Sequence, residues 1–268
     1  MALGNTSEVY TVSTPSTNSR VKMRISVVIP TLNERAHLPR TVEALQKCTQ
    51  KSGMLHEIII ADGGSSDGTC DWVLAQKAMK LLQCERGRGT QQNAGAAPAI
   101  GEVIFFLHAD CLPSPRALDA IAHAMKNPRV VGGCFRIGFQ KNQTSRPLRH
   151  IARAINFRSR TARTATGDQG VFVRRESSQD IGGFQSWPLF EDIDFVTRLK
   201  SQGRFVVLKT TLVISARRWQ TFGAARTTAL MGALLLGYHL KISPFVLKRW
   251  FSDMTPSLSK TNEKYDEK

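Results

Sequence analysis

The sequence predicts an α/β protein whose central sheet is mostly parallel. Short apolar runs rich in β-branched residues alternate with helical stretches, a spacing typical of right-handed βαβ units. The run at residues 103–107 is apolar without interruption, which is typical of a strand buried on both faces. We therefore expect one folded domain with a terminal tail on each side. The expected boundaries are a disordered tail at 1–22, a domain at 23–253 with halves at 23–113 and 114–253, and a flexible tail at 254–268.

Composition limits the cellular setting and the partners. A net charge of +16 indicates an anionic partner. Charge alone does not choose among a phosphorylated small molecule, a nucleic acid and an acidic membrane surface. The five cysteines are scattered without CxxC spacing, so we expect reduced thiols rather than disulfides or a zinc site. No secretory signal opens the chain, and the apolar segment 229–240 is too short to span a bilayer. These features predict a cytoplasmic protein.

The first half of the domain contains the alternating pattern. The predicted strands lie at 24–30, 57–62, 81–84 and 103–107, and the predicted helices at 36–47, from about 68 to Lys80, and after the Arg86–Gly89 loop. Ser66 or Asp67 can cap the second of these helices. Pro30 closes the first strand, and Pro113 lacks the N–H needed to continue a strand ladder. Ser114 is the expected N-cap of a helix over 115–126.

The second half departs from that alternation. A longer strand is predicted at 130–139, short strands at 170–173 and 205–214, an amphipathic helix over 193–200, and helix again to about residue 251. The segment 146–163 is dense in arginine and has no acidic residue. A solvated helix face would explain it, but unrelieved repulsion favours an anion site, with a membrane surface as the second interpretation.

Three of the loops should meet at the carboxyl edge of the sheet, and each brings a carboxylate. The loops at 31–34, 62–67 and 108–110 carry Glu34, Asp62 and Asp110. Gathering like charges is costly unless a cation or a hydrogen-bonding ligand is present. A nucleoside diphosphate with Mg²⁺ or Mn²⁺ would supply both, with Asp110 as a hard oxygen ligand. The alternative is three separate helix caps, which explains Asp67 well but not Asp62, because glycines follow Asp62.

The order of several short motifs resembles the family 2 glycosyltransferases of GT-A fold. The matching segments are 26–34, 57–69, Arg88-Gly89, 93–96, 107–110, Gly182-Gly183-Phe184 and Glu191-Asp192. They run in family order from about residue 24 to about residue 205. The segment 167–175 with His108-Ala109-Asp110 most resembles a bacterial-type, radical SAM/selenodomain-associated subfamily linked by name to arsenosugar biosynthesis. This resemblance implies a Rossmann-like nucleotide-binding half at 23–113, and an acceptor half with C-terminal helices at 114–253.

The resemblance also implies a UDP- or GDP-linked sugar donor and a divalent metal, Mn²⁺ or Mg²⁺. The implied donor-binding residues are Pro30, Asn33, Glu34, Asp62, Gly64, Arg86, Arg88, Asn93, His108 and Ala109, and the implied metal ligands are Asp110 and His108. His108 stands where the family has the first carboxylate of its Asp-x-Asp motif. An imidazole can bind Mn²⁺, ribose or phosphate but cannot replace the carboxylate's charge. A strand-end histidine satisfied by the backbone is the alternative.

Asp192 matches the general base of the family, with Glu191 beside it as a second catalytic candidate. Inverting transfer needs one carboxylate to take the proton of the acceptor hydroxyl as that oxygen attacks the anomeric carbon. The alternative is that both acids only stabilise the positive end of a helix. The polar turn Gly167-Asp168-Gln169 suits an acceptor that the sequence does not identify, although ordinary turn chemistry would also explain it.

Two other functions compete with this enzyme. A non-enzymatic basic module could bind an anionic membrane or nucleic acid through the segment 146–163. No recognisable nucleic-acid motif is present, so we expect no nucleic-acid partner. A nucleotidyltransferase would need a glycine-rich phosphate loop after the first strand, and Pro30–Glu34 is not one.

Overall fold

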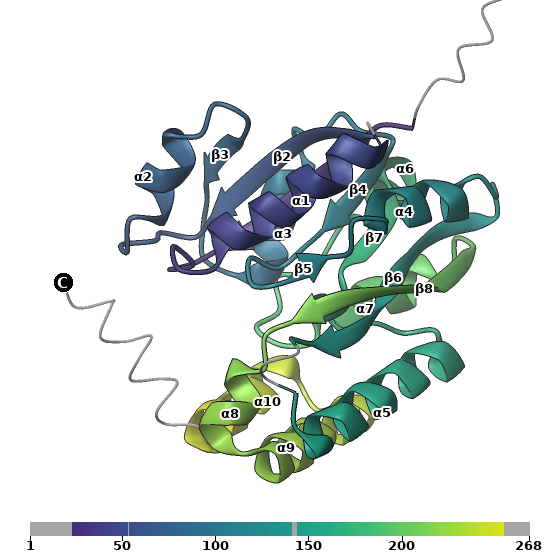
Figure 1. Ribbon diagram of the computed structural model, residues 1–268. Coiled ribbons are helices and arrows are strands. Elements are labelled where there is room, and N and C mark those ends of the chain that lie inside the picture. The colour runs from purple at the N-terminus through teal and green to yellow at the C-terminus, as the bar shows by residue number, and fades with distance from the viewer. Residues whose placement is uncertain (1–22, 53, 141–143, 255–268) are drawn as a thin grey trace, which may run out of the picture.

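The computed structural model describes residues 23–52, 54–140 and 144–254 (Figure 1), so the predicted tails at 1–22 and 255–268 lie outside the described residues. The described strands form one sheet in the order β3-β2-β1-β4-β7-β6-β8-β5. Its first half contains β1 (Ile25–Thr31), β2 (Leu55–Asp62), β3 (Lys80–Gln83) and β4 (Val103–Phe106). These four strands run parallel, as the alternating pattern predicts.

The second half of the sheet is mixed. It contains β5 (Leu112–Pro113), β6 (Val130–Phe139), β7 (Val171–Arg174) and β8 (Arg204–Ile214). β7 runs antiparallel to both β4 and β6, while β8 runs parallel to β6. Pro113 does not continue the ladder of β4, as predicted, and lies instead in the separate short strand β5, which pairs antiparallel with β8. Since β5 is the outermost strand of the sheet, the missing N–H of Pro113 costs no ladder bond on its open side.

The helices form layers around this sheet. They are α1 (Leu38–Ser52), α2 (Thr69–Leu74), α3 (Arg88–Ala96), α4 (Ala117–Met125), α5 (Arg146–Ala162), α6 (Arg175–Asp180), α7 (Glu191–Leu199), α8 (Arg217–Phe222), α9 (Ala224–His239) and α10 (Pro244–Met254), with a 3-10 turn at Gly167–Gln169. Figure 1 shows α5, α8, α9 and α10 gathered below the sheet, on the side away from β2 and β3. We call these four helices the basal layer.

Three predicted boundaries are wrong. α2 ends at Leu74 instead of Lys80, because Lys80 enters β3 and pairs with Ile59. Its N-cap is Gly68 in the left-handed conformation, and Asp67 instead accepts a hydrogen bond from the backbone N–H of Thr69. α4 begins at Ala117 with Arg116 as its N-cap, while Ser114 supplies a carbonyl to the backbone N–H of Ala117.

The prediction that Pro30 ends the first strand is also wrong, because Thr31 still pairs with Asp62. The carbonyl of Val28 accepts a hydrogen bond from the backbone N–H of Leu107, in the loop after β4. Pro30 lies two residues further along the strand, so its backbone nitrogen faces the same side as that carbonyl. The pairing with β4 stops at Val28. The missing N–H of Pro30 therefore lies where no ladder partner remains.

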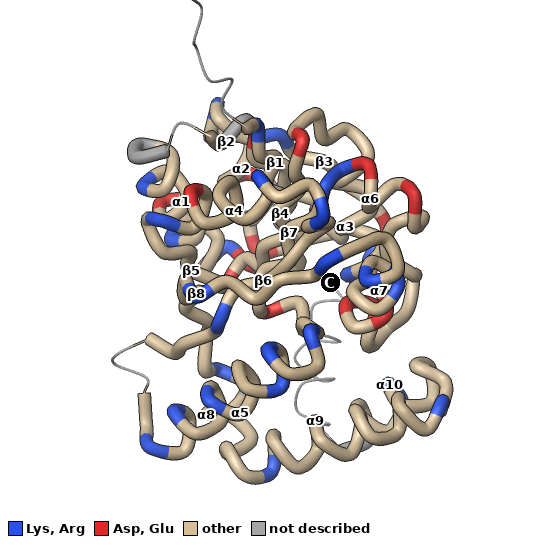
Figure 2. The backbone as a smooth tube through the Cα atoms, turned by 90° about the vertical axis from the view of Figure 1, so that its right-hand side faces the viewer, with Lys and Arg blue, Asp and Glu red and all other residues tan. Residues whose placement is uncertain are grey.

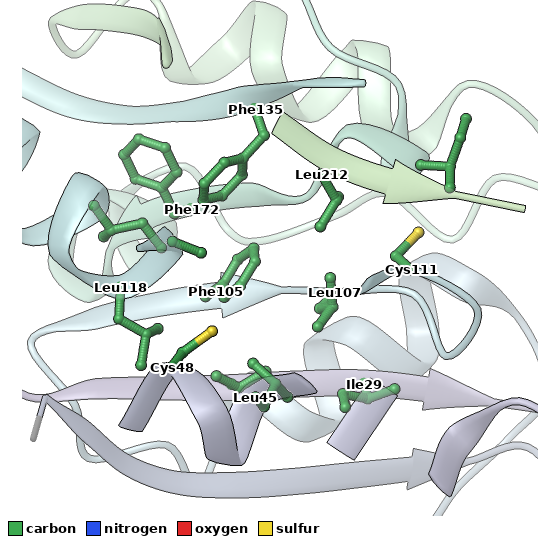
Figure 3. Close-up of a cluster of buried hydrophobic side chains, with 14 of the residues drawn as sticks. Ile29, Leu45, Cys48, Phe105, Leu107, Cys111, Leu118, Phe135, Phe172 and Leu212 are labelled. Atoms are coloured by element: carbon green, nitrogen blue, oxygen red, sulfur yellow. The ribbon is translucent and has the colours of Figure 1, made fainter. Parts of the chain in front are cut away.

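The central strands β1 and β4 are buried on both faces, as the run at 103–107 predicts. Residues 103–107 are all at most 1% exposed. Alternate residues of β1 and β4 belong to two separate apolar clusters: Val27 and Phe105 to one, Val28 and Ile104 to the other. The first cluster packs beneath α1, α4 and α5 (Figure 3), and the second includes residues of α7 and packs against α3. Helices on both faces hold the strand ends rigidly in place.

Glu57 ties the strands together at the opposite, amino end of the sheet. Its side chain is 7% exposed, and Oε1 accepts hydrogen bonds from Ser26 Oγ (2.6 Å) and from the backbone N–H of Ile100 (2.8 Å). Oε2 pairs with Lys80 Nζ at 2.7 Å. Burial acts to raise the pKa of Glu57, but the bonds from Ile100, Lys80 and Ser26 outweigh it and hold the pKa below its usual value.

We expect Glu57→Gln to lower the free energy of unfolding by about 1–3 kcal/mol at neutral pH. The donors on Ser26, Ile100 and Lys80 would then face a neutral amide in place of a charged carboxylate. A depressed carboxyl pKa stabilises the fold above the unfolded value of about 4.3, and this contribution is lost as the pH falls through the folded pKa. The difference from wild type in urea unfolding should therefore shrink below about pH 4. Glu43→Gln, which breaks only the exposed pair with Lys47, is the control. A pH-independent difference at Glu57 would contradict this account.

Candidate active site

The loops after β1, β2 and β4 meet at the carboxyl edge of the sheet, as predicted. The backbone N–H of Asn33 donates to Ser65 Oγ at 2.8 Å, and that of Glu34 donates to Thr69 Oγ1 at 3.1 Å. Thr41 of α1 donates from Oγ1 to the carbonyl of Ala109 at 2.7 Å, which fixes the loop after β4. Segments separated by tens of residues thus form one continuous rim.

Asp62 organises the first part of this rim. Its fully buried carboxylate accepts hydrogen bonds from Thr31 Oγ1 (2.8 Å), Ser65 Oγ (2.6 Å) and the backbone N–H groups of Gly64 (2.9 Å) and Ser65 (2.8 Å). Burial acts to raise the pKa of Asp62, but the bonds from Ser65 and Thr31 outweigh it and lower the pKa. Asp62 caps no helix, so the helix-cap alternative fails for this residue.

Gln91 of α3 is a second organiser of the rim that sequence reasoning missed. Its buried Nε2 donates to the carbonyls of Thr31 (2.7 Å) and Ala61 (2.9 Å), which lie at the ends of β1 and β2. The carbonyl of Thr31 also accepts from the backbone N–H of Gly63 at 3.0 Å, so Gln91 adds a second bond where the pairing of β1 and β2 ends. No sequence pattern distinguishes this glutamine from its neighbour Gln92.

Arg217 is the most consequential residue that the sequence analysis missed. From the start of α8, its Nη2 lies 2.7 Å from Glu34 Oε1 and 3.2 Å from Asp110 Oδ2. One guanidinium therefore bridges two of the three predicted carboxylates. The sequence gives no local sign of this, because Arg217 lies in a stretch that reads only as basic and helical. The bridge shows that this edge holds positive charge between Glu34 and Asp110.

A second group of side chains lies where α3 and α7 begin. Arg88 contacts Glu191 through Nε–Oε1 at 2.9 Å and Nη2–Oε2 at 3.3 Å, and the Glu191 side chain is only 3% exposed. Burial raises the pKa of Glu191, and the negative charge of Asp192 raises it further. The positive charge of Arg88 acts to lower the pKa but does not cancel the rise. Glu191 and Asp192 occupy the first turn of α7, so the helix-dipole alternative is compatible with their position.

Asp192 and His108 both contact the turn at Gly167. The backbone N–H of Gly167 donates to Asp192 Oδ2 at 2.5 Å, and Asp192 is 6% exposed. A Cβ on Gly167 would come within 2.7 Å of His108 Nε2 and 3.5 Å of Asp192 Oδ2, so only glycine fits between them. Burial lowers the pKa of His108, and the charge of Arg88 lowers it further. Asp110, Asp168 and Asp192 act in the opposite direction without reversing the shift. A lowered pKa favours the neutral imidazole, which can act as a ligand or acceptor.

Two predicted ligand residues have their amides engaged within the protein. Asn93 donates from Nδ2 to the carbonyl of Phe184 and accepts from its backbone N–H, both at 2.8 Å. Gln169 is fully buried and accepts from Ser159 Oγ at 2.9 Å. These bonds position α3 and the Gly167 turn, and direct ligand contacts by the two amides stay a prediction.

The remaining predicted residues lie around the same rim. Asp168 accepts from Thr166 Oγ1 at 2.6 Å and is partly exposed. Pro30 is partly buried at the end of β1, Ala109 is 3% exposed in the loop after β4, and Arg86 is exposed before α3. Gly64, at φ 96°, allows the turn that brings its N–H to Asp62. The structure therefore brings the predicted residues to one edge of the sheet.

The donor set suits a metal that the substrate helps to hold. Within residues 23–52, 54–140 and 144–254, no three His, Cys, Asp or Glu side chains form a cluster that could bind a metal by themselves. Asp110 offers a partly exposed carboxylate, and His108 offers a neutral imidazole. Mg²⁺ is commonly held by one or two carboxylates together with substrate phosphates. The residues present therefore fit Mn²⁺ or Mg²⁺ only in company with a diphosphate.

Solved structures with the same fold define the class of protein. The chain is similar to residues 1–349 of TarS from S. aureus in complex with UDP, with a TM-score of 0.59 and 19% identity over 72% of this chain and 60% of that one. It is also similar to the mannosyltransferase PcManGT from Pyrobaculum calidifontis in complex with GDP-Man and Mn²⁺, with a TM-score of 0.55 and 22% identity over 72% and 57% of the two chains. The architecture is the GT-A fold of glycosyltransferases.

Sequence comparison then gives the family. The family model described as glycosyl transferase family 2 matches residues 26–182, and the chain belongs to this family. An uncharacterized glycosyltransferase of Nostoc sp., alr2836, is 35% identical over 117 residues, which is 41% of this chain and 35% of that protein. The match thus spans about a third of that relative. The family match includes Asp62 and Asp110 but ends before Glu191, Asp192 and Arg217.

Proposed function

We propose that the protein moves a sugar from a UDP- or GDP-linked donor to an acceptor hydroxyl with inversion at the anomeric carbon. The observation that carries this proposal is the position of Asp192, which lies against Gly167 and close to His108 at the rim formed by the loops after β1, β2 and β4. A buried carboxylate beside the donor-binding edge is what proton removal from an acceptor requires.

The donor would lie along the rim. In this proposal Asp62, Asn33 and Glu34 bind the base and ribose, with Pro30, Gly64 and Ala109 shaping the pocket. Solved relatives are named as complexes with UDP, UDP-GlcNAc and GDP-Man with Mn²⁺, which supports a nucleotide-sugar donor. Asp110 and His108 would hold Mn²⁺ or Mg²⁺, and the bound cation would neutralise charge on the leaving diphosphate. Arg217, Arg88 and Arg86 add positive charge on the same side.

The chemical step follows from these positions. Asp192 takes the proton of the acceptor hydroxyl while that oxygen forms a bond to the anomeric carbon, and the bond from that carbon to the diphosphate oxygen breaks. The backbone N–H of Gly167 holds Asp192 Oδ2 in place. Arg88 binds the carboxylate of Glu191, whereas the carboxylate of Asp192 accepts hydrogen bonds from the backbone N–H groups of Gly167 and Ile193. The acceptor would bind beside Gly167, Asp168 and Gln169.

The narrower assignments belong to this proposal as well. The segment 167–175 with His108 favours the arsenosugar-linked subfamily, and the scattered thiols favour a cytoplasmic location. All five cysteines lie in the described ranges, and none of them forms a disulfide there. Membership of an enzyme family, together with the buried carboxylates, favours an enzyme over the non-enzymatic basic module.

Nucleotide binding provides the first test. With UDP or GDP at 100 times its Kd, we expect the free energy of unfolding to rise by about 2.7 kcal/mol. This corresponds to an increase in Tm of roughly 5–10 °C for a domain of this size. The increase should be larger with Mn²⁺ than with EDTA, because the metal and the diphosphate bind together.

The metal assignment is tested by Asp110→Asn in the same thermal-shift assay. The variant should lose the Mn²⁺-dependent part of the increase and keep the part seen in EDTA. Asp119→Asn on α4, outside the rim, is the control. If Asp110→Asn responds to Mn²⁺ as wild type does, Asp110 is not the ligand. If neither UDP nor GDP shifts Tm, the donor class is wrong.

A further inference from the structure

The outer surface of α9 and α10 is apolar. Leu236 and Leu240 are 61% and 67% exposed, and Phe245, Val246 and Trp250 are 61%, 42% and 45% exposed. Leu236 and Leu240 lie one turn apart at the end of α9, Val246 and Trp250 lie one turn apart on α10, and the two helices contact each other. These residues form the docking face, which we define as Leu236, Leu240, Phe245, Val246 and Trp250. A contiguous exposed apolar patch of this kind marks an interaction surface.

The inner faces of the same helices are already packed. Leu234 and Leu247 are at most 1% exposed and form a core with Leu189, Phe190 and Ile193 at the start of α7. α9 therefore has apolar residues on its inner side and, through Ala229, Gly232, Ala233 and Leu236, on its outer side. A helix that is apolar all round is normally buried or in contact with lipid. The packing explains only the inner side.

The charge around the docking face is mostly positive, and Asp253 of α10 is the one acidic residue in the four basal helices. Residues 195–252 contain no Asp or Glu, and neither do residues 145–163 of the α5 region. Figure 2 shows Lys and Arg positions on α5 and α8 and along the pair of α9 and α10. Lys241 and Arg249 lie exposed next to the docking face. We define the basic residues of the basal layer as Arg146, Arg149, Arg153, Arg158, Arg160, Arg226, Lys248 and Arg249, together with Lys241 between α9 and α10. Arg217 is excluded because it pairs with Glu34 and Asp110.

We infer that the docking face binds the surface of an anionic lipid bilayer, with its apolar side chains inserted among the acyl chains and the basic residues of the basal layer at the headgroups. The exposed apolar side chains and the basic residues both suit this partner. Aromatic and aliphatic side chains enter the membrane interface, and Lys and Arg attract anionic lipid. In the described ranges no helix is long and apolar enough to cross a membrane. The contact is therefore interfacial.

Other occupants fit less well. A second copy related by a two-fold axis would place the same strongly basic surface against itself, and like charges would repel. Nucleic acid would match the basic residues but not the exposed Leu236, Leu240 and Val246. The C-terminal residues 255–268 contain few apolar side chains, chiefly Leu258 and Tyr265, so they offer little to cover the face. Only a bilayer uses both the charge and the apolar area.

This surface lies close to the candidate active site. The core beneath α9 and α10 includes Phe190 and Ile193, which directly flank Glu191 and Asp192. α8, which begins with Arg217, contacts α9. A bilayer bound at the docking face would therefore lie on the Asp192 side of the protein. The inference does not depend on sugar transfer, because lipid binding is measured without donor or acceptor.

The test is flotation of the purified full chain with vesicles of phosphatidylcholine containing phosphatidylglycerol, compared with pure phosphatidylcholine. We expect binding to the anionic vesicles that weakens with salt, and much weaker binding to the neutral ones. The triple change Leu240→Ser, Phe245→Ser and Trp250→Ser should weaken binding by at least roughly tenfold, because three inserted side chains are lost. Lys241→Gln with Arg249→Gln should weaken binding to the anionic vesicles and reduce its salt dependence, while the remaining basic residues keep part of both.

Matched controls separate the docking face from general hydrophobicity and charge. Leu74→Ser with Ile100→Ser removes side chains that are 71% and 49% exposed in α2 and before β4. Lys77→Gln with Lys126→Gln removes exposed charges outside the basal layer. Neither control should change flotation. Equal Tm values and equal UDP or GDP responses would show that every variant is folded.

Insertion has its own spectroscopic sign. Trp250 fluorescence should shift to shorter wavelength with anionic vesicles and be quenched by brominated lipid, and Trp250→Phe should abolish the change. Three results would overturn the inference: equal flotation of the triple variant and wild type, no binding of wild type to anionic vesicles, or a dimer in solution that the same triple change dissociates. Tighter binding of RNA or DNA, lost in the triple variant, would overturn it in favour of a nucleic-acid partner.

Discussion

Replacing Asp192 by Asn should lower the rate of sugar transfer by roughly 10²–10⁴-fold, the usual size of general-base catalysis. Affinity for UDP or GDP should stay near the wild-type value, because Asp192 lies at the Gly167 turn while the nucleotide is proposed to lie along the loops after β1 and β2. The measurement is transfer from a donor sugar with Mn²⁺ present, together with nucleotide titration by thermal shift. The amide keeps the shape of the carboxylate but cannot take the proton.

Two further variants make this result specific. Asp194→Asn, on the same helix, breaks only an i,i+4 pair with Arg198 at 2.7 Å and should leave the rate nearly unchanged. Glu191→Gln should affect the rate less than Asp192→Asn, since the carboxylate of Glu191 is held by Arg88. Full transfer activity in Asp192→Asn would show that the base is assigned wrongly. A larger loss in Glu191→Gln would move the role to Glu191.

Replacing Arg88 by Met should lower the free energy of unfolding by about 2–3 kcal/mol at neutral pH, because Glu191 would be buried without its partner. This is below the roughly 3–5 kcal/mol typical of a broken buried pair. The reduction is expected because the Arg88 side chain is 40% exposed and because Glu191 can take up a proton. Urea unfolding measures the change. The double variant Arg88→Met with Glu191→Gln should recover at least half of the loss, since no buried carboxylate remains.

The sign of the pH dependence follows from the raised pKa of Glu191. The unfolded Glu191 releases its proton near pH 4.3, while the folded residue keeps its proton to higher pH. Its contribution to stability is therefore fully present below about pH 4.3 and is lost as the pH rises through the folded pKa. Relative to Glu191→Gln, wild type should lose stability over this window, and Arg88→Met should lose more. A constant difference across the window would contradict a raised pKa.

The hydrophobic pattern along the chain was sufficient to predict features that depend on residues of a single strand. The apolar run before His108 predicted a doubly buried strand because its side chains alternate between two covered faces, and the structure confirms this. Parallel strands bring their carboxyl ends to one edge, so the meeting of the loops that carry Glu34, Asp62 and Asp110 was predictable as well. Errors arose at ends of elements. Lys80 pairs with Ile59 of β2, and such pairing overrides a local helix preference.

The sequence by itself determined the α/β class, the three carboxylate loops and, through its ordered motifs, the family. Only the tertiary structure decided which cations meet those carboxylates. Arg217 reaches Glu34 across 183 residues, and Arg88 reaches Glu191 across 103. The apolar outer face of α9 and α10 became evident only when their inner faces were seen packed against α7. The physical reason is that such contacts depend on how separate layers pack, and hydrophobic periodicity within one element does not encode the side chains of another.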